Sequence, residues 1–174
     1  MTECPDVPWG TDDDDVDIAP AFNEQPAKAA VFFLEFLKSK RIATGRIVDL
    51  GCGKGRNAIF FVKNHFEVHA IDHKDEMLKD LELHGVKAYC QDVTDFLLFE
   101  DRFFDLAMDV HCYDLQQPER RKNYRSELRR ILSPQGYYLL SVRNMSKEEI
   151  EKEFSDFEIL SFEKDGDSLN FIMR

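Results

Sequence analysis

The segment at residues 47–57 constrains the fold of this chain more than any other. Its apolar, β-branched run includes Asp49 and leads into three glycines at alternate positions, after which a helical pattern begins. Such a succession predicts a strand, a tight turn and a helix. Glycine permits positive φ angles and lets the backbone approach a ligand closely. Because open α/β sheets bind ligands at the carboxyl ends of their strands, the turn is predicted to be a ligand site.

The spacing of the glycines distinguishes two kinds of ligand site. Dinucleotide-binding domains use G-x-G-x-x-G, in which the third glycine lets the helix pack on the strand and the helix start holds a pyrophosphate. Here the glycines stand at positions 51, 53 and 55, and Arg56 takes the place of that third glycine. Asp49, just before the turn, is a poor neighbour for a pyrophosphate and suits a cation. The spacing therefore weighs against a nicotinamide-dependent oxidoreductase.

Three further apolar runs also end in an aspartate, at Asp72, Asp92 and Asp109. Asp72 lies about 21 residues past Gly51, near the usual spacing of an acid that accepts hydrogen bonds from ribose hydroxyls. In a parallel sheet the four carboxylates would gather along one edge, where like charges repel unless a ligand offsets them. An adenosine that carries a sulfonium and an ammonium group would offset them.

Strand and helix patterns alternate along the rest of the chain, which indicates a parallel sheet with helices on both faces. Beyond the helix capped by Asn23, helices are predicted at residues 56–65, 75–83, 94–98, 118–132 and 146–154. The last two strands, near 157–163 and 168–173, are predicted to form an antiparallel hairpin. The helix at 118–132 carries a stripe of basic residues, which we interpret as a solvated outer face because the rest of the chain is acidic.

Together these motifs resemble the class I methyltransferases that use S-adenosylmethionine. The matching stretches lie at residues 48–55, 71–73, 91–93, 104–109 and 132–137. Residues 53–57 look most like the small tellurite-resistance and thiopurine-type branch, while Gln135 departs from the second glycine usual in the family. The resemblance implies a Rossmann-like α/β fold, with a doubly wound, mostly parallel seven-stranded sheet and an antiparallel C-terminal hairpin strand.

The resemblance also implies S-adenosylmethionine as cofactor, S-adenosylhomocysteine as product and a set of cofactor-binding residues. The methionine end would be held by Asp49 and the backbone of the glycine turn, and the ribose by Asp72. The adenine would lie against residues that follow the second and third strands. The implied set is Asp49, Gly51, Cys52, Gly53, Asn57, Asp72, His73, Met77, Asp92, Val93 and Asp109.

Composition limits the partners and the location that can be expected. The net charge of −11 argues against a nucleic-acid surface, since phosphate binding needs a basic patch. No apolar run approaches the 18 or so residues of a membrane span and no signal segment is visible, so a cytoplasmic protein is expected. The cysteines form no C-x-x-C pair, and no metal site is predicted. We expect a monomer or a homodimer.

The chain divides into an arm and one domain. Residues 1–23 hold a run of four aspartates with little periodicity and are predicted to be a flexible acidic arm, whereas residues 24–174 form the single domain. Trp9 in the arm either folds over the cofactor cleft as a lid that contacts substrate or docks on the core. With no added substrate domain, short loops and this arm are left to recognise the acceptor.

Candidate catalytic residues follow the strand that ends in Asp109. His111 either acts as a general base near neutral pH or merely fills the loop, and Tyr113 is a candidate for orienting an acceptor. A soft, already ionised acceptor needs no base, because much of the rate can come from holding nucleophile and methyl group in line. Arg143, at the end of a later strand, is a candidate for binding an anionic acceptor.

Three hypotheses about function remain. The first is a methyltransferase that acts on a small-molecule acceptor, such as a soft nucleophile or an oxyanion. The second is a protein that binds S-adenosylmethionine or S-adenosylhomocysteine without chemistry, since the implied cofactor residues are complete while no acceptor residue is certain. The third, a nicotinamide-dependent oxidoreductase, is disfavoured by Arg56 in the glycine turn.

Overall fold

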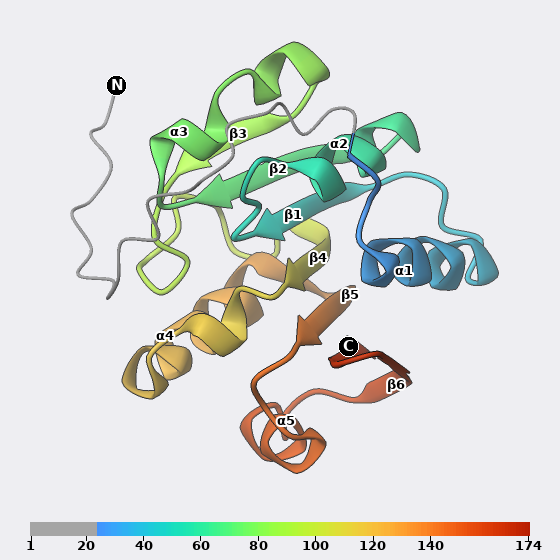
Figure 1. The fold of residues 1–174 in the computed structure, drawn as a ribbon, viewed down its shortest axis with the longest axis vertical. Helices are drawn as coiled ribbons and strands as arrows, with labels where there is room; N and C mark the ends of the chain where they lie inside the picture. Colours follow the sequence, from blue (N-terminus) through green and yellow to red (C-terminus); the bar gives the residue numbers. More distant parts are fainter. Residues whose placement is uncertain (1–23) are drawn as a thin grey trace.

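The computed structural model describes residues 24–174 and is built around a seven-stranded sheet (Figure 1). The strands lie in the order β3-β2-β1-β4-β5-β7-β6. Their bounds are β1 Arg46–Leu50, β2 Glu67–Asp72, β3 Lys87–Cys90, β4 Phe104–Val110, β5 Leu132–Val142, β6 Ile159–Asp165 and β7 Ser168–Met173. The arm predicted at residues 1–23, Trp9 included, lies outside the described residues.

The strand directions confirm the predicted fold class. β1 pairs in parallel with β2 on one side and with β4 on the other, and β2–β3 and β4–β5 are parallel as well. β7 lies antiparallel between β5 and β6, so the C-terminal hairpin enters the sheet as predicted. Chain order reverses between β1 and β4, and α/β sheets bind ligands beyond the strand ends at such a switch point.

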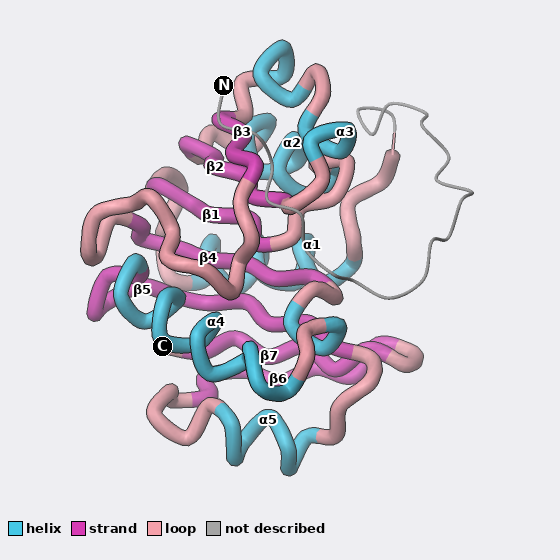
Figure 2. The backbone as a smooth tube through the Cα atoms, turned by 90° about the vertical axis from the view of Figure 1, so that its left-hand side faces the viewer, coloured by secondary structure: helices cyan, strands magenta, loops and turns pink. Residues whose placement is uncertain are grey.

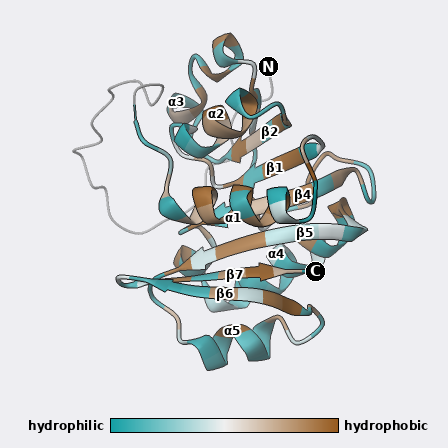
Figure 3. Cartoon of the chain, turned by 90° about the vertical axis from the view of Figure 1, so that its right-hand side faces the viewer, coloured by the Kyte–Doolittle hydropathy of each residue, from teal (hydrophilic) through white to brown (hydrophobic). Residues whose placement is uncertain are grey.

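Helices cover both faces of the sheet (Figure 2). α1 and α2 pack on one face with Ile47, whereas α4 and α5 pack on the other with Val48. Successive residues of β1 thus belong to different cores, because strand side chains alternate between faces. In Figure 3 the middle of β1 is hydrophobic and α5 is mostly hydrophilic. The helix bounds are α1 Lys28–Ser39, α2 Arg56–Lys63, α3 Asp75–Leu78, α4 Pro118–Ile131 and α5 Lys147–Glu153.

Three predicted helices differ from the structure. α1 begins at Lys28 with Ala27 at its N-cap, so Pro26 precedes it, and Asn23 lies outside the described residues. The helix expected at 75–83 is split into α3 and a 3₁₀ helix, Leu81–His84, because Asp80 between them has a left-handed backbone with φ of 66°. No helix forms at 94–98. There the backbone N–H and hydroxyl of Thr94 both donate to Asp92, at 2.8 and 2.6 Å, and this local turn replaces the helical hydrogen bonds.

The basic stripe of α4 is neutralised by acids from neighbouring segments, which corrects the interpretation of a merely solvated face. Arg121 and Arg125 both approach Glu153 of α5, and the guanidinium of Arg129 lies over the ring of Phe157, 3.4 Å from its centre. Five acids pair with Arg120, Arg129 and Arg130: Asp92, Asp95, Asp101 and Asp156 come from other segments, and Glu127 lies in α4 itself. These arginines therefore tie α4 to its neighbours, whereas Lys122 of the same stripe is exposed.

Residues 24–174 hold neither a membrane-spanning helix nor a cluster of metal-binding side chains. No helix in this part of the chain is long and apolar enough to cross a membrane. The same residues contain no group of three or more His, Cys, Asp or Glu side chains arranged to hold a metal ion.

Candidate functional site

The glycine turn has the backbone geometry that its sequence predicts. Gly51, Gly53 and Gly55 all have positive φ angles, of 71°, 52° and 80°. The N–H groups of Gly51 and Cys52 both donate to the carbonyl of Ile71 at 2.9 Å, which fixes the turn against the end of β2. A Cβ added at Gly51 would lie 2.3 Å from the sulfur of Cys112, whereas one added at Gly53 would meet nothing within 4 Å. The turn therefore packs tightly at Gly51 and is open at Gly53.

Asp49, at the end of β1, is a buried carboxylate with an unused oxygen. Its side chain is 2% exposed, and among residues 24–174 its Oδ2 has no hydrogen-bond partner. Burial first, and then the charges of Asp109 and Asp72, raise the pKa of Asp49 to about 8. Since a buried unpaired carboxylate is costly, this position favours a cationic ligand or a bound proton.

Asp72, at the end of β2, connects that strand to the glycine turn. Its Oδ2 accepts from the N–H of Gly53 at 2.9 Å, and its Oδ1 accepts from the N–H of Lys74 at 3.0 Å. Nδ1 of His73 lies 3.5 Å from Oδ1. His73 and Met77 are half-buried beside it. The structure thus joins the proposed ribose residue Asp72 to Gly53 of the turn and to His73.

Asp92, after β3, has partners that the sequence analysis did not foresee. Nη1 of Arg120 donates to its Oδ2 at 2.9 Å, while Thr94 occupies Oδ1. Arg120 also contacts Asp95 at 3.0 Å. Val93 is 7% exposed. The carboxylate predicted to accept from an adenine amino group is therefore held by an ion pair with α4.

Asp109, near the end of β4, is fully buried and organises the loop that follows. Its Oδ1 accepts from the N–H groups of Cys112 and Tyr113, and its Oδ2 accepts from the hydroxyl of Tyr124 at 2.7 Å. That hydroxyl lies 3.0 Å from the hydroxyl of Tyr138. Burial raises the pKa of Asp109 to about 7, although these hydrogen bonds oppose the rise. Both carboxylate oxygens of Asp109 thus accept hydrogen bonds from the protein, and its place beside the methyl group stays a prediction.

His111 lies beyond the end of β4 with an unusual backbone. Its φ of 65° is in the left-handed region, which is uncommon for a residue other than glycine. Its Nε2 is 3.0 Å from the hydroxyl of Ser168 and 3.2 Å from that of Ser141. Burial first, and then the positive charge of Arg143, lower the pKa of His111, while Asp114 opposes the shift. At neutral pH its ring is therefore uncharged.

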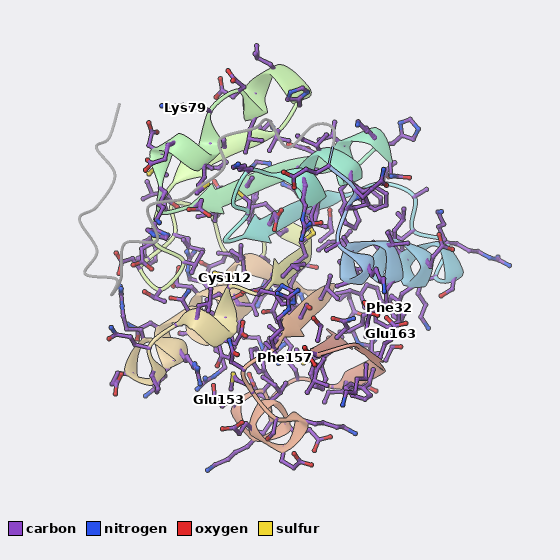
Figure 4. The ribbon with its side chains drawn as sticks, viewed as in Figure 1. Phe32, Lys79, Cys112, Glu153, Phe157 and Glu163 are labelled. Atoms are coloured by element: carbon purple, nitrogen blue, oxygen red, sulfur yellow. The ribbon has the colours of Figure 1, made fainter. Side chains whose placement is uncertain are left out.

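Tyr113 is buried, and its hydroxyl is paired with ionic groups from α4 and α5. Its side chain is 0% exposed, and its hydroxyl donates to Glu153 and accepts from Arg125. Figure 4 shows Glu153, the last residue of α5, well apart from Cys112. A fully buried hydroxyl between two ionic groups has no face for an acceptor, which corrects the expectation for Tyr113.

Two other predicted residues differ in how they contribute. Arg143 is exposed, and its Nε approaches the hydroxyl of Ser168 at 3.3 Å, so it shares a neighbour with His111. Asn57 is 7% exposed, and its Oδ1 accepts from the N–H of Ala27 at 2.9 Å. The side chain of Asn57 therefore joins the start of α2 to the start of α1. Trp9, which was predicted to contact the substrate, lies outside the described residues.

Several site residues were missed by the sequence analysis. Ser141 and Ser168 contact His111, and Arg120 holds Asp92, yet these residues are 30, 57 and 28 positions away from their partners. No pattern within a few residues of the sequence indicates contacts between such distant positions. Thr94 is different, because an aspartate two residues before a threonine is a recognisable turn signal.

The residues at the strand ends fit S-adenosylmethionine. Asp49 offers an unused buried oxygen to a positive charge, and Gly53 leaves open space where the backbone would approach a ligand. Asp72 lies between the two, hydrogen-bonded to Gly53. An anionic ligand such as a pyrophosphate would instead meet three acids in the same place, since Asp49 is close enough to Asp72 and Asp109 for their charges to raise its pKa.

Comparison with known proteins agrees with this fit. A family described as "Methyltransferase domain" matches residues 47–136, just over half of the chain. EEF1A lysine methyltransferase 2 of Homo sapiens is 26% identical over 153 residues, which cover 80% of this chain and 64% of that protein. The Mus musculus protein of the same name is 27% identical over 148 residues, covering 78% and 60%. The chain thus spans less than two thirds of these relatives.

Solved structures share the fold. The 1,6-didemethyltoxoflavin-N1-methyltransferase of Burkholderia thailandensis, bound to S-adenosylhomocysteine, superposes with a TM-score of 0.74 at 19% identity, covering 91% of this chain and 79% of that one. TehB from Haemophilus influenzae superposes with a TM-score of 0.65 at 17% identity, covering 79% and 59%. This chain therefore belongs to the methyltransferase domain family, with the fold of the class I, S-adenosylmethionine-dependent methyltransferases that its motifs resemble.

Proposed function

We propose that this protein binds S-adenosylmethionine at the ends of β1 and β2 and transfers its methyl group to a small-molecule acceptor beyond the ends of β4 and β5. The observation that carries the proposal is the unused, buried oxygen of Asp49 beside the open turn at Gly53. That pair suits a cationic ligand held by backbone groups. The strand order reverses at the same place, where α/β sheets bind their ligands.

In this proposal the chain's own residues bind and orient, while the cofactor supplies a methyl group on a positively charged sulfur. Asp49 offsets the positive charge of the methionine end, and Asp72 accepts from the ribose hydroxyls while it fixes Gly53. His73, Met77 and Val93 border the adenine, with Asp92 held by Arg120. The loop from His111 onward, supported by Asp109, faces the methyl group. Much of the rate then comes from holding acceptor and methyl group in line.

The acceptor is proposed to be a small molecule because the described domain offers only short loops around the strand ends. The loop after β4 contains His111, and the loop after β5 contains the exposed Arg143. Arg143 lies close enough to His111 for its charge to lower the pKa of that histidine. An acceptor with a hydroxyl, a thiol or an oxyanion fits these two side chains.

A second candidate acceptor is a lysine side chain of another protein. The observation that favours it is the sequence relationship to two proteins named lysine methyltransferases, at 26% and 27% identity. A net charge of −11 would also attract a basic segment of a partner.

Mass spectrometry of reaction mixtures tests the proposal and separates the two acceptors. The protein is incubated with S-adenosylmethionine and, in parallel, with thiols, phenols, oxyanions and lysine-containing basic peptides. We expect S-adenosylhomocysteine to form together with a methylated small molecule, and both to form more slowly with the Asp72→Ala variant when the cofactor is limiting. Methylation of peptides alone would overturn the small-molecule acceptor. If the protein binds the cofactor but methylates no acceptor in either group, it is a binding protein and the proposal is wrong.

A further inference from the structure

Four polar side chains from three neighbouring strands and their ends form a continuous chain of hydrogen bonds. Oγ of Ser141 donates to Oδ1 of Asn170 at 2.7 Å, and the same Oγ lies 3.2 Å from Nε2 of His111. Oγ of Ser168 lies 3.0 Å from that Nε2. Ser141 and Asn170 are 0% and 1% exposed, and they are direct cross-strand partners in the β5–β7 register.

The position of His111 in this chain is fixed by the sheet. Val110, the last residue of β4, pairs with Ser141, and the N–H of His111 donates to the carbonyl of Ser141 at 2.9 Å. The left-handed backbone of His111 then turns its ring toward β7. A non-glycine residue in this region is strained, and such strain gathers at functional sites.

The donors and acceptors of the chain assign the tautomer of His111. A serine hydroxyl has a single proton, and Ser141 gives it to Oδ1 of Asn170. With the Asn170 amide oriented so that its Oδ1 faces Ser141, Ser141 is an acceptor toward His111, and Nε2 then carries the hydrogen. In a neutral imidazole the other nitrogen, Nδ1, then holds the lone pair. Within residues 24–174, Nδ1 of His111 has no hydrogen-bond partner, which leaves that lone pair available.

We propose that Ser141 and Asn170 are positioning residues that hold His111 with its hydrogen on Nε2, so that Nδ1 is the atom that takes a proton from the methyl acceptor. This inference rests on the proposed function. An O–H, S–H or N–H proton of the acceptor passes to Nδ1, and the freed electron pair forms the bond to the methyl carbon. The bond from that carbon to sulfur breaks with its electron pair left on sulfur, giving S-adenosylhomocysteine. The imidazolium then returns its proton to water.

The charged groups around His111 suit this role. Burial and the cations Arg143 and Arg56 lower its pKa, and only Asp114 raises it. His111 is consequently neutral at pH 7 and ready to accept a proton. As the pH falls through its pKa, Nδ1 becomes protonated and the rate of methyl transfer is expected to fall with it.

The first arm of the test reads the tautomer directly in the protein without cofactor. Two-bond nitrogen–proton couplings of the ¹⁵N-labelled His111 ring distinguish a protonated Nε2 from a protonated Nδ1. We expect the hydrogen on Nε2 in the wild type. In Ser141→Ala the couplings should show a mixture of tautomers, because Ser168 alone can either donate or accept. A hydrogen on Nδ1 in the wild type would overturn the proposal.

The second arm measures methyl transfer to an acceptor that carries a proton. Ser141→Ala is expected to lower kcat by about tenfold or more, because a base in the wrong tautomer is ineffective. Its affinity for S-adenosylhomocysteine should stay near that of the wild type, and Ser141→Thr, which keeps the hydroxyl, should recover most of the rate. Ser161→Ala on β6 serves as a serine control.

The two arms separate the possible failures. If the hydrogen is on Nε2 but neither the wild type nor any variant transfers a methyl group, the proposed function is wrong, and so is the role of Nδ1 as a base. The positioning of His111 by Ser141 and Asn170 would still stand. If Ser141→Ala shifts the tautomer but leaves both kcat and its pH profile unchanged, Nδ1 is not the base.

Discussion

Replacing Asp72 with alanine is expected to weaken the binding of S-adenosylmethionine and S-adenosylhomocysteine by about tenfold to a hundredfold, the cost of losing a charged acceptor. Two effects add here. The ribose hydroxyls lose their acceptor, and the N–H groups of Gly53 and Lys74 lose the carboxylate that fixes the turn. Asp72→Asn should be milder, because one oxygen remains to accept. Isothermal titration calorimetry measures the change in affinity.

The control for Asp72 is Asp75, an exposed acid in the first turn of α3. Asp75→Ala should change the affinity by no more than about twofold, as is usual for surface substitutions. The melting temperature of each variant without ligand shows whether the domain still folds. Wild-type affinity in a folded Asp72→Ala variant would show that the ribose is held by other residues.

Replacing Asp49 with asparagine is expected to stabilise the ligand-free protein at alkaline pH while abolishing tight cofactor binding. The pKa of Asp49 is raised to about 8 in the folded protein, against about 3.8 when unfolded. Its contribution to stability is therefore present at acidic pH and is lost as the pH rises through this range. Asparagine resembles the protonated acid and avoids that loss. We expect the melting temperature at pH 9 to rise by about 5 °C or more, which corresponds to a few kcal/mol.

Thermal unfolding at several pH values checks the sign of this effect. The difference between Asp49→Asn and the wild type should shrink steadily between pH 9 and pH 5. Asp167→Asn, which changes an exposed acid in the β6–β7 hairpin, should show no such dependence. If Asp49→Asn is less stable than the wild type at pH 9, the ionised carboxylate of Asp49 does not destabilise the folded protein, and the prediction is wrong.

The succession of strands along the chain and the acids at their ends could be predicted because the information is local. A strand that stops at an acid, as at Asp72, shows its pattern within a few residues, and parallel strands place such ends on one edge. The capping box at the start of α5 is equally local, with Ser146 and Glu149 three residues apart, and it forms as its sequence indicates.

Other features depend on contacts that no local pattern encodes. The partners of His111 arrive from β5 and β7, and the partner of Asp92 arrives from α4. Tyr113 follows His111 by two residues, yet the 3₁₀ turn that begins at Tyr113 sends its ring toward Tyr124 and Phe154. Side-chain direction after a strand end is set by such turns, which is why neighbouring residues in the sequence took different roles.

The stretch at 94–98 shows how a local signal can be overruled. Its composition allows a helix, but Phe96 is 68% exposed, so a helix there would bury little apolar surface. The hydrogen bonds from Thr94 to Asp92 hold a turn in its place. Leu97 is already buried without a helix, at 1% exposed, so a short helix here would gain little further packing.

Calorimetric titration of the wild-type protein with S-adenosylhomocysteine and, separately, with NAD tests the central claim most directly. The glycine spacing, the buried acid at the end of β1 and the open turn all favour a cationic adenosine ligand over a pyrophosphate. We expect saturable binding of S-adenosylhomocysteine, tighter binding of S-adenosylmethionine because of its positive sulfur, and no measurable heat with NAD. Tight binding of NAD together with no binding of either sulfur ligand would contradict the account.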